Sequence, residues 1–166
     1  MDKLKLYEKD IERFDFYIEK ADNKASFLLA FEGIVLTLLT TLTNGFLKNM
    51  DNSIVKNTVI ILLVVAVVAI VAAAVSSASV IFPRFSKATG TSVLYYNDVK
   101  NLKATEFIER VNSLGEEQKL KDFAEQAVVL AKICSNKMVG IRWSIIFLGI
   151  ASGAIVAMNL LSIVCI

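Results

Sequence analysis

The chain has 166 residues, of which 55% are hydrophobic and 20% charged, and it contains no histidine. Soluble domains are about 45–50% apolar, and the excess here is concentrated in three long segments, which excludes a soluble globular enzyme. The missing histidine removes the commonest general base and transition-metal ligand, and two cysteines are too few for a zinc cage. We therefore expect no enzymatic activity, no metal and no cofactor.

Three segments are long and apolar enough to cross a membrane as helices. Residues 25–47 contain one charge, Glu32, whereas residues 57–83 and 143–166 contain none. Each segment exceeds the roughly 18 residues that mark a transmembrane helix, and backbone groups in lipid must be paired within their own segment. The sequence predicts an all-α membrane protein in which three transmembrane helices carry a small cytoplasmic helical domain.

Residues 1–24, before the first span, carry a heptad pattern. No Gly or Pro interrupts it, so we predict one helix from about residue 3 to about residue 46. The seam is expected either to pack on the protein's own helices or to drive oligomerisation. Its apolar positions alternate in steps of three and four, at Leu4, Tyr7, Ile11, Phe14, Ile18, Ala21, Ala25 and Leu28.

The first span carries a polar stripe. At 100° per residue, one arc of about 100° holds small and polar residues, and Glu32 lies beside it. We predict a pore-lining stripe in which Glu32 forms a cation-favouring ring between subunits. The alternative is that the threonines bond to carbonyls of their own helix and that Glu32 reaches the cytoplasmic interface. The candidate pore residues are Glu32, Thr37, Thr40, Thr41 and Asn44.

The distribution of basic residues predicts the topology. Six of the eighteen Lys and Arg precede the first span, ten lie between Arg84 and Arg142, and two lie in the loop of residues 48–56. Cytoplasmic segments carry the excess of Lys and Arg, so the N-terminus and residues 84–142 are expected in the cytoplasm and the loop outside. Asp22 and Lys24, at the first boundary, are expected to form a structural ion pair or to contact a neighbouring subunit at a gate.

Residues 84–142 are expected to form the cytoplasmic helical region. Residues 85–91 are predicted to be a loop, residues 92–112 two short helices, and an S-x-x-E capping box at Ser113 the start of a helix that continues through the third span. Its apolar seam is interrupted only by Lys137.

The same region offers a candidate nucleotide site, because cations attract phosphates and aromatic rings stack on bases. The tyrosines are as well explained as core residues. The candidates are Arg84, Lys87, Tyr95, Tyr96, Lys100 and Lys103.

Several stretches resemble one known family. Residues 14–29 contain the pattern A-D-x-K-A-x-x-L-L, residues 82–84 read Phe-Pro-Arg, and residues 95–99 read Tyr-Tyr-Asn-Asp-Val. Ala131, Lys137 and Arg142 follow at matching spacing before the last span. These motifs resemble Pycsar-type transmembrane effectors of bacterial anti-phage defence, and the resemblance covers most of the chain.

The resemblance implies a multi-pass protein of the bacterial inner membrane that impairs the membrane when a nucleotide signal changes. A partner nucleotidyltransferase or cyclase is implied as the source of that signal. The sequence shows no cyclic-nucleotide-binding domain, so a standalone form is expected, similar to the membrane effector of the Hailong system. That likeness implies an ion channel controlled by a single-stranded oligonucleotide.

Enclosing a water path with three spans per chain requires a homo-oligomer, for which a tetramer is the working assumption. A holin-like lysis protein and a non-conducting membrane scaffold remain as alternatives.

Overall fold

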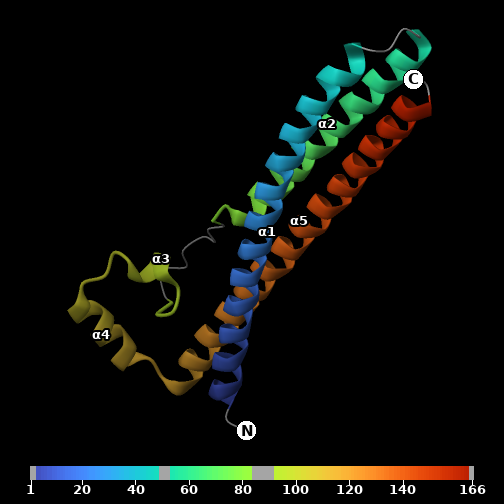
Figure 1. Ribbon diagram of the computed structural model, residues 1–166. Helices are drawn as coiled ribbons and strands as arrows, with labels where there is room; N and C mark the ends of the chain where they lie inside the picture. Colours follow the sequence, from blue (N-terminus) through green and yellow to red (C-terminus); the bar gives the residue numbers. More distant parts are fainter. Residues whose placement is uncertain (1–2, 49–52, 84–91, 165–166) are drawn as a thin grey trace. The chain divides into compact units, whose positions relative to one another are not determined.

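The computed structural model describes residues 3–48, 53–83 and 92–164, and the regular structure in these ranges is helical (Figure 1). The helices are α1 (Lys3–Lys48), α2 (Ser53–Ile81), α3 (Tyr96–Val99), α4 (Ala104–Ser113) and α5 (Glu116–Val164). By length and composition, α1, α2 and α5 each contain a segment able to cross a membrane. The predicted all-α class with three spans is confirmed.

The chain divides into two compact units. We call residues Met1–Lys20 and Pro83–Asn136 the head unit, and residues Ala21–Phe82 and Lys137–Ile166 the span unit. Helices α1 and α5 each run without a break from the head unit into the span unit. This agrees with the two continuous helices that the sequence predicts.

The span unit is built from α2 and the C-terminal parts of α1 and α5. Figure 1 shows the three helices side by side, with α2 running opposite to the other two. Small residues of α2 and α5 let the helices approach closely, as is usual for helices in membranes. The buried core consists of Leu39, Val59, Ala66, Ala69, Ile70, Ala151, Ala154 and Met158.

Much of the apolar surface of the span unit is exposed. At most 28% of the residues in any of the three apolar windows are buried. Large side chains such as Phe27, Val75 and Ile163 are at least 65% exposed. Water would oppose a surface of this kind, whereas lipid accommodates it, so the exposure pattern is that of a membrane-embedded unit.

The heptad pattern of α1 corresponds to its inner face. Every seam position from Leu4 to Leu28 is buried or half-buried, while most residues between them are exposed. In the span unit, the seam residues Ala21 and Ala25 are completely buried against Val80 and Ile141. The seam therefore packs on helices of the same chain, which is the first of the two predicted roles.

The head unit contains α3, α4 and the N-terminal parts of α1 and α5. Carboxylates hold the segment before α3, because Asp98 accepts the Ser92 N–H at 3.1 Å and Asp122 of α5 accepts the Val93 N–H at 2.9 Å. The hydroxyl of Ser92 accepts the N–H groups of Leu94 and Tyr95. The two short helices predicted within residues 92–112 are confirmed as α3 and α4.

The predicted capping box at Ser113 is wrong. Ser113 is the last residue of α4, and its hydroxyl donates to the Arg110 carbonyl instead of capping the next helix. Helix α5 begins at Glu116, and the Gln118 side chain accepts the Gly115 N–H at 3.3 Å. The predicted loop of residues 85–91 lies outside the described residues.

Candidate functional site

A buried polar cluster joins the three helices of the span unit. The Glu32 side chain on α1 is 1% exposed, and its Oε1 atom accepts hydrogen bonds from Ser77 of α2 at 3.1 Å and Ser144 of α5 at 2.8 Å. The two serine hydroxyls also lie 2.8 Å apart. We call these three residues the Glu32 cluster. It contributes one residue from each spanning helix.

The Glu32 side chain does not lie in either of the places that the sequence predicts. It is buried, so it is neither on the exposed face that carries the threonines nor extended to the cytoplasmic membrane interface. Two serines of the same chain hold it between the helices, and its Oε2 atom is buried without a hydrogen-bond partner among the described residues. An unpaired charge at the centre of a bilayer costs about 2.5–3.5 kcal/mol or more, so this arrangement needs a specific explanation.

A second polar cluster lies about 15 Å from Glu32 along α1, ten residues earlier in the helix. Lys137 of α5 is 4% exposed, and its ammonium group donates to the Asp22 carboxylate and, at 2.6 Å, to the Val80 carbonyl of α2. We call Asp22, Lys137 and the Val80 carbonyl the neck cluster. It satisfies a carbonyl at the end of α2 and links all three helices.

The neck cluster corrects the predicted pairing of Asp22. Its partner is Lys137, whereas Lys24 is exposed and forms no ion pair with a described residue. Close backbone approach accompanies the pair, because a Cβ atom on Gly140 would lie 2.5 Å from the Val80 side chain. The absence of a side chain at Gly140 therefore allows α5 to reach α2 beside Lys137.

The threonines of α1 form an exposed polar face. Thr37 donates to the Gly33 carbonyl at 2.9 Å, and Thr40 and Thr41 donate to the Thr37 carbonyl at 2.8 and 2.9 Å. The predicted alternative of bonds within the helix is therefore confirmed for these hydroxyls. Their oxygen atoms keep acceptor capacity toward the outside. The side chain of the fifth candidate, Asn44, lies outside the described residues.

The candidate nucleotide residues are only partly described. Arg84 and Lys87 lie outside the described residues. Tyr95 and Tyr96 stack edge to face with their ring centres 5.2 Å apart, and Tyr96 is 54% exposed.

Lys100 and Lys103 follow α3 closely and are both exposed, without an ion pair to any described residue. Together with the Tyr96 ring they give the segment around α3 exposed cations and one exposed aromatic face.

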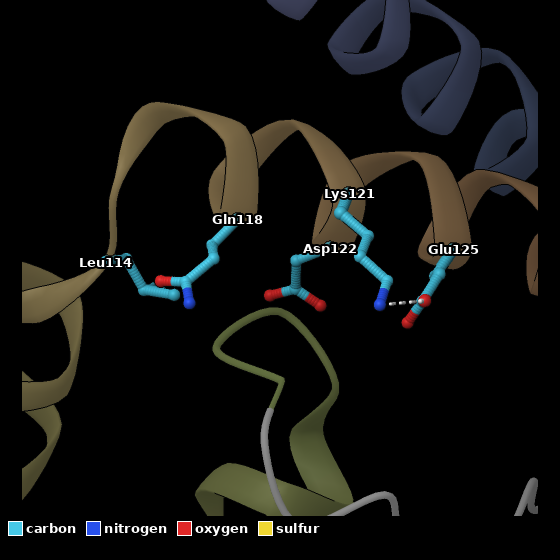
Figure 2. Close-up of a pocket in the computed structure, with 5 residues that line it drawn as sticks. All are labelled: Leu114, Gln118, Lys121, Asp122 and Glu125. Carbon is cyan, nitrogen blue, oxygen red and sulfur yellow. Dashed lines mark ion pairs between the residues drawn. The ribbon is translucent and has the colours of Figure 1, made fainter.

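Neither of two hollows in the head unit is lined by these candidates. One, of about 230 Å³, is lined along α5 by Leu114, Gln118, Lys121, Asp122 and Glu125. Figure 2 shows Asp122 pointing toward the loop before α3 and Lys121 paired with Glu125 at 3.8 Å. Because two carboxylates accompany the one lysine, this hollow does not attract an anionic ligand.

The second hollow, of about 310 Å³, is also acidic. Glu8, Glu12 and Asp15 of α1 line it together with apolar side chains that include Leu94 and Phe123. Burial raises the pKa of the Asp15 carboxyl group above its ordinary value. The hollow thus pairs carboxylates with an apolar lining, which also disfavours phosphate groups.

The comparisons with known proteins cover both units. The profile of the Pycsar effector protein domain matches residues 6–164. The chain belongs to the Pycsar effector family. It is 25% identical over 149 residues to the Pycsar effector protein SaPycTM of Staphylococcus aureus, which covers 90% of this chain and 89% of that protein. No solved structure matches the chain significantly.

Members of the Pycsar effector family are membrane effectors of phage defence rather than a catalytic family. The A-D-x-K-A-x-x-L-L motif of this Pycsar effector contributes Asp22 to the neck cluster and the buried Ala21 and Ala25 to the helix contact beside it. In this chain the motif therefore holds α1 against α2 and α5.

Sequence reasoning missed the contacts of three residues within this Pycsar effector. The sequence marks Lys137 as the polar interruption of a seam and as part of a motif of the family, but it does not reveal the partner Asp22, although a lysine on an apolar face is a signal that a buried acid faces it. Ser77 and Ser144 gave no signal alone, because serines are common where membrane helices pack. Only the fold brings Glu32 to them, across 45 and 112 positions of the chain.

Proposed function

We propose that this effector is an oligomeric, nucleotide-controlled ion channel that depolarises the inner membrane of phage-infected bacteria. The observation that supports it most is the threonine face of α1, where Thr37, Thr40 and Thr41 are exposed on a spanning helix. The packing of the single chain leaves this polar face uncovered. Polar side chains in a membrane segment typically face a water-filled path or a partner helix.

The path is proposed to lie between subunits. Within one chain, apolar side chains and the Glu32 cluster form the core between the helices, and a hollow of about 350 Å³ between α1 and α2 is almost entirely apolar, so it offers no polar path. Several copies that turn their threonine faces inward would enclose a polar path, for which a tetramer is the working assumption. Gly33 lies on the same face, and no atom lies within 4 Å of where its Cβ would be, so a neighbour could approach closely there.

The head unit is proposed to be cytoplasmic and to receive the signal. The excess of Lys and Arg in the segments that form it supports this orientation. The signal is proposed to be a cyclic nucleotide or a single-stranded oligonucleotide made by a partner cyclase or nucleotidyltransferase. The segment around α3, with Tyr96, Lys100 and Lys103 exposed, is the proposed contact, with Arg84 and Lys87 contributing from the preceding residues.

The neck cluster is proposed to be the gate. Helices α1 and α5 enter the span unit beside Asp22 and Lys137, so a movement of either helix changes this contact. Breaking it would free α2 from Lys137 and let the three helices separate at that end. Lys24, which is exposed, is proposed to contact the neighbouring subunit.

Ion flux from liposomes tests the channel. The purified full chain is reconstituted, and release of a monovalent cation is recorded for the wild type and for Thr37→Val, Thr40→Val and Thr41→Val combined. We expect flux to fall at least about tenfold, because the valines remove polar groups from the path. Thr58→Val is the matched control, because Thr58 is exposed on α2 and also bonds to its own helix. Wild-type flux in the triple variant would contradict the pore position.

Ligand binding is tested with cyclic mononucleotides and short single-stranded oligonucleotides as probes. Lys100→Ala combined with Lys103→Ala is expected to weaken binding about tenfold or more, since each lysine contributes a phosphate contact. Lys132→Ala removes an exposed lysine of α5 elsewhere in the head unit and is expected to bind normally. Equal affinities for all three proteins would exclude the segment around α3 as the site.

A further inference from the structure

The carboxyl group of Glu32 has hydrogen-bond donors but no compensating charge in the part of the chain that the structure describes. Both donors are neutral serine hydroxyls, and they bond to the same oxygen atom, Oε1. The other oxygen, Oε2, is buried and has no partner among the described residues. All three residues of the Glu32 cluster are at most 1% exposed. The hollow of about 350 Å³ that Glu32 helps to line is otherwise apolar, so it adds no compensating charge.

Among the described residues, no element packed against Glu32 brings a cation to it. Helix α2 contributes Ser77, and the chain has no ionisable residue between Lys56 and Arg84. Helix α5 contributes Ser144, while its Lys137 is bound to Asp22 in the neck cluster and its Arg142 is exposed. The nearest lysine of α1 before Glu32 is Lys24, which is exposed and about 12 Å away along the helix.

The Glu32 cluster also has one hydrogen atom fewer than it has oxygen–oxygen contacts. Three oxygen–oxygen contacts of 2.8, 2.8 and 3.1 Å join Glu32, Ser77 and Ser144. Two serine hydroxyls supply two hydrogens, so at most two of these contacts are hydrogen bonds when the carboxyl group is ionised. One additional positive centre, either a proton on the carboxyl group or an ion between the oxygens, would remove the remaining repulsion.

We propose that the Glu32 cluster is a binding site for one small monovalent cation, a proton or an alkali metal ion, held inside each subunit. One carboxylate carries one negative charge, so a monovalent cation leaves the buried site neutral, whereas a divalent ion would leave an excess positive charge. An alkali ion contacts oxygens from all three spanning helices, and a proton supplies the third hydrogen for the three contacts among them. In either case, binding stabilises the packing of α1, α2 and α5.

Thermal unfolding of the full chain in lipid nanodiscs tests the site. The wild type is compared from about pH 5 to about pH 9, and in sodium, potassium or a bulky organic cation at equal ionic strength. A ligand that binds only the folded state raises the unfolding temperature, so we expect a rise of about 3 °C or more with the bound cation. The response is expected to be lost in Glu32→Gln, which keeps the shape but needs no cation.

Glu19→Gln is the matched control, since Glu19 is an exposed carboxylate of α1. It is expected to keep the wild-type response, and subtraction removes the titration of the other acids. A response to pH alone identifies the proton, and a response to sodium or potassium at constant pH identifies the alkali ion. If Glu32→Gln responds to both as the wild type does, the proposal is overturned.

Infrared spectroscopy of the wild type gives a second measurement that does not depend on the stability of Glu32→Gln. A bound proton produces the carbonyl band of a neutral carboxyl group, and an alkali ion shifts the carboxylate bands. Ser144→Ala removes the shortest hydrogen bond to Glu32 and should change the cation concentration at half-occupancy by about tenfold. Bands of a free carboxylate that neither pH nor ions alter would refute the site. These measurements record binding and stability, so their outcome is independent of whether the protein conducts ions.

Discussion

At the scale of single residues, Lys137 carries a charge that is costly to bury, and it contacts both of the other spanning helices. A buried ammonium group must be paired, and Lys137 is paired twice, with the Asp22 carboxylate and with the Val80 carbonyl. Because Asp22 keeps 37% of its side chain exposed, water can partly compensate it when the lysine is lost. The main effect of Lys137 is therefore to hold the three helices together, and its ion pair with Asp22 is the smaller part of that effect.

Replacing this lysine should weaken the span unit. Lys137→Met keeps the length of the side chain but leaves the Val80 carbonyl and Asp22 without their donor, so we expect a loss of about 1–3 kcal/mol. Unfolding in a detergent series measures it. Lys24→Met is the control and should change stability by less than about 0.5 kcal/mol, because Lys24 is exposed. Equal losses of unfolding free energy in the two variants would show that the neck cluster does not contribute to stability.

Asp15 gives the head unit a dependence on pH. Burial beside the acidic hollow raises its pKa, which means that the folded state favours the protonated form. The stability linked to Asp15 is therefore fully present below its unfolded pKa and is lost as the pH rises through its higher folded value. Asp15 as a whole stays exposed, so water screens this effect, and the cost of the ionised carboxylate at neutral pH is small.

Removing this carboxylate should stabilise the protein at neutral pH. We expect Asp15→Asn to unfold at higher denaturant concentration than the wild type at pH 7, and the difference to shrink as the pH falls through the folded pKa of Asp15. Unfolding curves of both proteins over an acid pH series provide the comparison. A difference that grows on acidification would mean that Asp15 is stabilised as a carboxylate, contrary to the proposed cause.

At the scale of elements, the contact of α2 with α5 depends on Gly140. Glycine costs about 1 kcal/mol in an ordinary helix, so its presence in the middle of α5 calls for a packing reason. The side chain of Val80 occupies the space that a Cβ atom would need, since it would lie 2.5 Å from that atom. By contrast, no atom lies within 4 Å of the same position at Gly149.

The two glycines should respond in opposite directions to alanine. Gly140→Ala forces Val80, a stiff β-branched side chain, out of its position and is expected to cost about 1–3 kcal/mol. Gly149→Ala is expected to be neutral or to gain up to about 1 kcal/mol from helix propensity. Unfolding of both variants in the same detergent makes the comparison. Stabilisation by Gly140→Ala would show that α2 and α5 do not approach closely.

Most of what the sequence predicts about the helices comes from the spacing of its apolar residues. The apolar seam of α1 marks its inner face because steps of three and four follow one side of a helix, whichever helix it meets. The start of α5 was misplaced because the sequence offers two alternatives, a serine that can cap and a glycine two residues later. The choice depends on where α4 ends.

Neither polar cluster could be predicted in the same way. The partners Asp22 and Lys137 are 115 positions apart, and periodicity says nothing about which faces of distant helices meet. Glu32 was assigned to an exposed stripe because its angle on the helix lies beside the threonines. The burial of Glu32 follows from Ser77 and Ser144, which only the packing of α2 and α5 brings to it.

At the scale of the whole molecule, orientation decides whether an internal signal can reach the head unit. The physical basis is the placement of basic residues, since sixteen of the eighteen Lys and Arg lie in the two segments predicted to be cytoplasmic. Retaining such segments is energetically favoured during insertion, whereas the loop of residues 48–56, with two lysines, can be translocated. The orientation makes a prediction that needs neither ligand nor ion flux.

Single-cysteine labelling in intact cells tests it. In a background with Cys134→Ser and Cys165→Ser, Lys56→Cys should react with a membrane-impermeant maleimide, because residue 56 lies near the start of α2, which the predicted orientation places outside. Glu117→Cys, at the exposed start of α5, should react only after the membrane is permeabilised. The reverse pattern would place the head unit outside the cell. It would then be separated from any nucleotide made inside, and the effector would have to respond to something other than a cytoplasmic messenger.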